Sequence, residues 1–187
     1  MQRLVHISTP GIYHDGKPHR DIRECDPLPV RPVNHYAATK RESERQVMHI
    51  AAGAGLPVIV LRPRAIFGPG DTAILPRIAK ALRQGRLRRI GNGDCVIDMT
   101  YIDNVVDAVL LAIAAPSDLT GHAYNISNGE PIRIWNVIDR LADAQTPALP
   151  DVVDPQERGD VHQQPDRYGP NAGRAVERTL DLVTRSE

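Results

Sequence analysis

The stretch HYAATKRESERQVMHIAAGAGLPVIVLRP, residues 35–63, joins the two kinds of element on which the fold depends. Residues 35–54 favour a helix, and Gly53 and Gly55 signal its end. Small and apolar positions, with one glutamate among them, lie on overlapping faces of that helix: Ala37, Glu44, Val47, Met48, Ala51 and Ala52. The apolar run LPVIVLRP (56–63) then predicts a buried strand. A helix that leads directly into a buried strand is typical of α/β proteins.

The same alternation continues on both sides of this stretch. RLVHIS (3–8), bounded by Thr-Pro-Gly, predicts a strand before the helix, and HAYNIS (122–127) predicts a third strand. Further helices are expected over about 74–84, 104–114 and 134–144, with a short segment at 98–102. We therefore predict an α/β fold with a parallel sheet and helices on both of its faces.

Two segments show no sustained periodicity. Residues 10–34 are rich in proline, charge and histidine, and they are long enough for a functional loop that could act as a lid. After residue 144 the sequence is dominated by proline, charge and glutamine. A chain of 187 residues has room for one substantial core, so we expect a folded domain over 1–145 and an irregular C-terminal arm over 146–187.

The composition narrows the classes of partner. The 23 basic and 23 acidic residues cancel, which gives no reason to expect a nucleic-acid or membrane partner. The arginine-rich run at 82–91 is interpreted as a solvated helix end or a phosphate contact for a small ligand. No apolar run approaches the length of a membrane span, and the N-terminus lacks a secretory signal, so we expect a cytoplasmic protein. Cys25 and Cys95 carry no metal-ligand or redox spacing, and no metal site is predicted.

Tyr36 and Lys40 are four residues apart and therefore share one face of the expected helix. A neighbouring ammonium favours the phenolate form of a tyrosine, which would make Tyr36 a usable proton donor or acceptor. The same spacing also occurs by chance on ordinary surface helices. The surrounding sequence decides between these two interpretations.

Five motifs follow one another in a fixed order: Ser8-Thr9 with Gly-Ile-Tyr, NHYAATKRESE, PVIVLRPRAIFGPGD, DMTYIDNVVDAVLLA and AYNISNGEPIRIW. Together they resemble the extended short-chain dehydrogenase/reductase superfamily, in its NAD-dependent epimerase/dehydratase group. The resemblance is greatest to the 3β-hydroxysteroid dehydrogenase-like branch, which includes sterol dehydrogenases and bacterial 2-alkyl-3-oxoalkanoate reductases. It extends over residues 3–145 and implies a Rossmann-like fold.

The resemblance implies three catalytic residues. Thr9, four residues before Tyr13, takes the place of the family's serine or threonine, Tyr36 is the acid/base and Lys40 is its partner. A threonine hydroxyl can donate to a substrate carbonyl, and the lysine can also bind a ribose hydroxyl of the cofactor. Without the family, the plainer interpretation of Thr9 is a strand-end hydroxyl that bonds to the backbone.

The resemblance also assigns residues to the cofactor and the substrate. Those implied to contact the cofactor are Lys40, Arg62, Pro63 and Ala65, and those implied to contact the substrate are Ile66, Phe67 and Tyr101. The local sequence offers plainer interpretations as well. Gly68 and Gly70 suit a strand-end turn, and Asp103 is a plausible helix N-cap, which is the role we expect for it.

The family's glycine-rich cofactor turn has no counterpart in this sequence. GAGLPV (53–58) lacks the third glycine and joins a helix to a strand, the reverse of the order that a phosphate-binding turn requires. The strand near residues 4–8 matches the fifth strand of the family. We therefore expect an incomplete Rossmann-like sheet, the C-terminal half of the family's domain, without roughly the first hundred residues. The stretch PDRYGPNAGRAVERTLDLV (165–183) also departs from the family's closing segment.

Two functions of different classes follow. The first is an NAD(P)-dependent oxidoreductase or epimerase acting on a hydroxyl or carbonyl group of a small molecule, which is sterol-like, 3-oxoalkanoate-like or a nucleotide sugar. Its cofactor would be NAD or NADP, although the missing turn argues against binding by this chain alone. The alternative is a truncated, non-catalytic relative that persists as a folded oligomeric or binding module. In either case we expect a homo-oligomer or association with a separate N-terminal half.

Overall fold

The strand β2 (Val58–Pro63) is the centre of the fold, and all six of its residues are buried. The computed structural model describes residues 3–88 and 94–143. Ile59, Val60 and Leu61 are each at most 3% exposed. A strand covered by helices on both faces needs a continuous apolar run of this kind rather than an alternating pattern. The run LPVIVLRP therefore has the burial that its sequence predicts.

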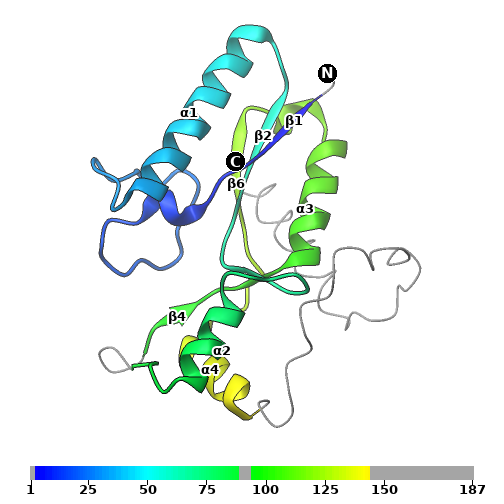
Figure 1. Ribbon diagram of the computed structural model, residues 1–187. Helices are drawn as coiled ribbons and strands as arrows, with labels where there is room; N and C mark the ends of the chain where they lie inside the picture. The colour runs from blue at the N-terminus through cyan, green and yellow to red at the C-terminus, as the bar shows by residue number, and fades with distance from the viewer. Residues whose placement is uncertain (1–2, 89–93, 144–187) are drawn as a thin grey trace, which may run out of the picture. The chain divides into compact units, whose positions relative to one another are not determined.

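Three parallel strands form the main sheet, in the order β1-β2-β6. The strand β1 (Leu4–Ile7) pairs with β2, and β2 pairs with β6 (His122–Ile126). The helix α1 (His35–Ala54) lies along one face of this sheet, and the helix α3 (Ile102–Ala114) lies along the other (Figure 1). The predicted α/β class and the parallel sheet with helices on both faces are confirmed.

The face of the sheet toward α3 holds the apolar core. Successive strand residues point to opposite faces, so Ile59 and Leu61 share this side. The buried members of the cluster are Ile59, Leu61, Ala108, Ala112 and Ile126, with Val5, Val109, Ala115 and Tyr124 packed against them. Small alanines on α3 let the helix approach the larger side chains of the strands closely.

Both ends of α1 are fixed by the residues that the sequence offers for this purpose. Asn34 is the N-cap, and its side-chain oxygen accepts a hydrogen bond from the Ala37 amide at 2.8 Å. Gly55 ends the helix in the left-handed conformation, with φ of 61°, which glycine adopts without strain. The helix therefore has the predicted bounds of 35–54, and GAGLPV is a helix-to-strand connection.

The chain divides into two compact units whose segments alternate in sequence. Of the described residues, the first unit contains 3–64 and 105–127, and the second contains 65–88, 94–104 and 128–143. The elements of the second unit are β3 (Ile66–Phe67), α2 (Leu75–Arg83), β4 (Val96–Ile97), β5 (Thr100–Tyr101), β7 (Ile132–Arg133) and α4 (Ile134–Asp143). In it β3 pairs with β5, β4 pairs with β7, and α2 packs against α4. Short two-residue strands of this kind were not predicted from the sequence.

The long segment after β1 begins with the 3-10 helix η1 (Pro10–Tyr13) and then has no regular structure up to residue 34. Hydrogen bonds from α1 and β6 hold it to the rest of the first unit. The Arg41 guanidinium donates to the Pro29 carbonyl at 2.6 Å, and the Asn125 amide donates to the Glu24 carboxylate at 2.7 Å. The structure thus shows the predicted loop in a tethered conformation, while a lid function stays a prediction.

The N-cap role predicted for Asp103 is wrong. The helix α3 begins at Ile102, directly after β5, so Asp103 lies in its first turn, where a carboxylate still interacts favourably with the helix dipole. A second 3-10 helix, η2 (Ser117–Leu119), precedes β6. The predicted C-terminal arm, 146–187, lies outside the described residues. In the described ranges, no helix combines the length and apolar character needed to cross a bilayer.

Candidate active site

Thr9 lies where β1 passes into η1. It is the N-cap of η1, and its hydroxyl oxygen accepts a hydrogen bond from the Gly11 amide at 3.1 Å. The plainer interpretation, a strand-end hydroxyl bonded to the backbone, is therefore part of its role. A hydroxyl can accept and donate at once, so the Thr9 hydrogen is still available to a substrate oxygen.

Tyr36 and Lys40 lie on the first turns of α1, close to Thr9. A methyl group placed on Gly11 would meet the Thr9 Oγ1 at 3.3 Å and the Tyr36 Cε1 at 3.9 Å, so both side chains border the same small volume. The Tyr36 side chain is 57% exposed. The Lys40 Nζ donates to the Ile7 carbonyl at 3.2 Å, at the end of β1. The three predicted catalytic residues are thus brought together at the carboxyl end of one strand.

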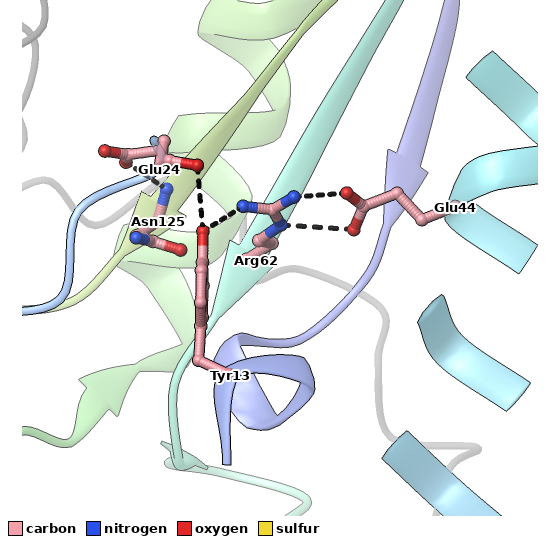
Figure 2. Close-up of polar contacts among 5 residues, drawn as sticks. All are labelled: Tyr13, Glu24, Glu44, Arg62 and Asn125. Atoms are coloured by element: carbon pink, nitrogen blue, oxygen red, sulfur yellow. Dashed lines mark hydrogen bonds and ion pairs between the residues drawn. The ribbon is translucent and has the colours of Figure 1, made fainter. Parts of the chain in front are cut away.

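The Arg62 side chain is buried and makes its contacts inside the protein. Its side chain is only 7% exposed, and its Nε and Nη2 donate to the two oxygens of the Glu44 carboxylate, the first at 3.1 Å (Figure 2). Its Nη1 donates to the Tyr13 hydroxyl, and its Cζ lies 5.2 Å from the centre of the Tyr13 ring. The guanidinium therefore binds Glu44 and Tyr13 within the protein. Any contact of Arg62 with a cofactor would come from its backbone.

The cluster continues beyond Tyr13 to the loop and to β6. The Tyr13 hydroxyl donates to the Glu24 carbonyl at 3.2 Å, and the Glu24 carboxylate accepts from the Asn125 amide at 2.7 Å (Figure 2). Burial raises the pKa of Tyr13 above its usual value, although the Arg62 charge acts in the opposite direction. Tyr13 therefore stays a neutral hydrogen-bond donor at physiological pH.

This cluster fixes the two elements that carry the catalytic candidates. Glu44 is on α1, eight residues after Tyr36, and Tyr13 is on η1, which begins directly after Thr9. Arg62 on β2 binds both. A buried ion pair of this kind holds its elements in one register, because displacement of either partner leaves a charge unpaired in the interior.

The substrate residues implied by the resemblance meet in the second unit. Ile66 and Phe67 pair in register with Thr100 and Tyr101. The rings of Phe67 and Tyr101 make an edge-to-face contact with centres 5.4 Å apart. These side chains are half-buried and supply an apolar surface.

The turn around these residues has two unusual backbone conformations. Ala65 has φ of 43°, in the left-handed region that a residue with a Cβ rarely adopts, and its carbonyl accepts from the Thr100 amide at 3.2 Å. Gly68 has φ of 142°, and a methyl group there would lie 2.6 Å from the Ile102 side chain. Strained positions next to a candidate site motivate a functional hypothesis.

The residues of the first unit fit the nicotinamide end of a dinucleotide. The Lys40 ammonium has three donors, and one of them is used by Ile7 in the described structure. Its remaining donors and the exposed Tyr36 ring are suited to hydroxyl groups of a bound ribose. Pro63 is the last residue of β2 and pairs in register with Ile126 of β6. No three acidic, histidine or cysteine side chains of the described residues are arranged to hold a metal ion.

The fold is Rossmann-like, and Tyr36 and Lys40 lie on the first turns of α1. The family model described as NAD dependent epimerase/dehydratase family matches residues 1–127. The chain belongs to this NAD-dependent epimerase/dehydratase family.

Curated relatives with similar sequences include a reductase and sterol dehydrogenases. A 2-alkyl-3-oxoalkanoate reductase from Stenotrophomonas maltophilia is 41% identical over 144 residues, covering 74% of this chain and 43% of the relative. The human sterol-4-alpha-carboxylate 3-dehydrogenase, decarboxylating, is 33% identical over 150 residues, covering 75% of this chain and 39% of the relative. The chain thus spans about two fifths of the length of these proteins.

Solved structures confirm the fold class. A UDP-glucuronic acid 4-epimerase from Bacillus cereus, in complex with NAD, has a TM-score of 0.67 at 24% identity, over 79% of this chain and 48% of that structure. RMD from Pseudomonas aeruginosa, complexed with NADPH, has a TM-score of 0.59 at 25% identity, over 78% of this chain and 52% of that structure.

Proposed function

We propose that this chain carries the catalytic half of an NAD(P)-dependent oxidoreductase or epimerase that acts on a hydroxyl or carbonyl group. The observation that supports this most is the convergence of Thr9, Tyr36 and Lys40 at the end of β1. The Thr9 hydroxyl and the Lys40 ammonium each keep a donor that is not used in the hydrogen bonds described above, and Tyr36 is 57% exposed.

The three residues would handle the substrate oxygen and its proton. When bound, the nicotinamide cofactor supplies or accepts the hydride. Thr9 donates a hydrogen bond to the substrate oxygen, and Tyr36 gives that oxygen its proton during reduction or removes it during oxidation. Lys40, one turn further along α1, would interact with the negative charge that proton transfer leaves on the Tyr36 oxygen.

The second unit and the relatives support one proposal for the substrate class. Ile66, Phe67 and Tyr101 offer an apolar and aromatic surface. Curated relatives named for an oxoalkanoate and for a sterol carboxylate act on lipophilic molecules, whereas one structural neighbour is named for a nucleotide sugar. The higher identities to the first group favour a lipophilic carbonyl or hydroxyl compound as substrate.

Titration with cofactor tests this function. NADH, NADPH and their oxidised forms would be added separately to the purified chain in a calorimeter. Sub-millimolar binding of one pair would support this function, provided that it is weakened at least tenfold in Lys40→Met and unchanged in the matched control Lys17→Met, whose exposed side chain lies in the loop. A chain that binds none of the four would favour the alternative, a non-catalytic binding module.

Association with another chain is the second part of the proposal. Among the strands that the structure describes, β1 pairs only with β2, so its outer edge is free to accept another strand. The outer side of α1 has a shallow hollow of about 480 Å³ next to Ile50, which is 66% exposed. Its lining residues are Ala38, Thr39, Glu42, Ser43, Gln46, Val47 and Ile50. Both features suit a homo-oligomer or a separate N-terminal half.

A further inference from the structure

The side of β1 that faces α1 carries two polar residues, His6 and Ser8, in addition to Leu4. Val5 packs into the α3 core, so His6 and Ser8 point to the opposite face, toward α1. Ser8 is 4% exposed, and its backbone amide donates to the Leu61 carbonyl at 2.7 Å. A buried polar side chain on an otherwise apolar sheet needs a hydrogen-bond partner.

Two buried polar atoms on this face have no protein partner within the described ranges. They are the Nε2 of His6 and the Oγ of Ser8. Side chains two residues apart on one strand face are about 6.6 Å apart, which is too far for a direct bond and suits one bridging water. The Ile7 carbonyl, which accepts from the Lys40 ammonium at 3.2 Å, belongs to the residue between them.

We propose that His6 and Ser8 are positioning residues for Lys40, and that they hold its ammonium against β1 through one shared water. That water would accept from Lys40 and bond to His6 and Ser8, which gives it the three partners typical of buried water. Lys40 would then use one donor on Ile7, one on the water and one on the cofactor side.

This arrangement requires a neutral His6. Neutral imidazole can accept at Nε2, whereas imidazolium is a donor at both nitrogens and repels the Lys40 charge. The charged groups that face His6 are Lys40 and Glu44 from α1, with Arg62 from β2 bound to Glu44. Burial and then the Lys40 charge hold the pKa of His6 below 6.5, and Glu44 offsets part of this effect.

For the proposed function, the protonation of His6 should set the lower pH limit of cofactor binding. At neutral pH the imidazole is uncharged and Lys40 is held in place. As the pH falls and His6 becomes protonated, the shared water no longer holds the Lys40 ammonium in place. The affinity for the cofactor therefore falls at low pH. This consequence rests on the proposed function, whereas the positioning of Lys40 by His6 and Ser8 does not.

Histidine NMR tests the inference in the chain itself, without any assay of activity. The imidazole nitrogens of uniformly ¹⁵N-labelled protein would be followed during a pH titration, with His6 assigned through His6→Gln. We expect the His6 ring to be protonated at Nδ1 and free at Nε2 near neutral pH. We also expect the midpoint of its titration to move upward in Lys40→Met and to stay in place in Lys17→Met.

Either of two results would overturn the inference: a His6 proton on Nε2 near neutral pH in the parent chain, or an unchanged midpoint in Lys40→Met. The tautomer measurement needs no variant, so a misfolded variant cannot hide the answer. If both NMR results are as expected but the parent chain binds no cofactor, the positioning of Lys40 by His6 and Ser8 is supported and the proposed function fails. If the chain binds the cofactor, the fall in cofactor affinity at low pH should be absent in His6→Gln, because a glutamine accepts a hydrogen bond without titrating.

Discussion

The buried Glu44–Arg62 pair gives the sharpest prediction of stability. Glu44 is 9% exposed and Arg62 is 6% exposed, and two of the guanidinium donors bind the carboxylate. Glu44→Ala would remove both bonds and leave the cation in the interior with Tyr13 as its remaining partner. Two charge-assisted hydrogen bonds contribute about 1.5–3 kcal/mol each. Breaking a buried pair from one side costs about 3–5 kcal/mol, which agrees with that sum, so we expect a loss of this size.

A neighbouring pair on the same helix is the matched control. Glu42 and Arg45 form an ion pair at 2.7 Å, but their side chains are 50% and 65% exposed. The Arg45 and Gln46 side chains lower the pKa of Glu42 to about 2, yet an exposed pair of this kind contributes little to folding. Glu42→Ala should therefore leave the free energy of unfolding nearly unchanged.

Urea denaturation followed by far-UV circular dichroism would measure these differences. The double variant Glu44→Met/Arg62→Met replaces the ion pair with apolar side chains and should recover most of the loss, because no charge remains buried. A cost for Glu44→Ala no larger than that for Glu42→Ala would refute the reasoning. So would a double variant that is less stable than Glu44→Ala alone.

Three further predictions concern the turn, the lysine and the assembly. Gly68→Ala should cost more than the strain of about 1 kcal/mol expected for Gly70→Ala, because only the first methyl group would meet Ile102, and equal unfolding midpoints would contradict this. Lys40→Met should weaken cofactor binding, because the ammonium donors proposed for the ribose hydroxyl are lost, and an unchanged affinity would count against this role. Sedimentation velocity at micromolar concentration should show an assembly through β1 or α1, whereas a 20.6 kDa monomer with fast amide exchange along β1 would exclude it.

The main elements could be predicted because their local signals agree with their tertiary environment. The helix over 35–54 has an N-cap at Asn34 and a left-handed glycine at its end, so its bounds are a local property. The apolar run in β2 is continuous because helices cover both faces of the sheet. The pairing of two-residue strands such as β3 and β5 depends on contacts more than thirty residues apart, and no local pattern indicates it.

The candidate site was only partly accessible from the sequence. The spacing of Tyr36 and Lys40 is a helical property, and the sequence order brought Thr9 to them through the resemblance. The resemblance placed Arg62 near the cofactor, which stays a prediction, but it did not indicate that the Arg62 side chain binds Glu44. The signal that could have found this contact is the glutamate itself, since a charged residue on a buried helix face requires a partner of opposite charge.

One measurement tests the central claim most directly: the transfer of deuterium from 4-deuterated NADH or NADPH to a lipophilic ketone, compared between the parent chain and Tyr36→Phe. The change removes a single hydroxyl from a 57% exposed side chain, so the fold should be retained. We predict labelled alcohol from the parent and a rate lower by about 10²–10⁴ in Tyr36→Phe, the contribution of a positioned acid or base. Equal rates in the two proteins, or no transfer by the parent with either cofactor, would contradict the account.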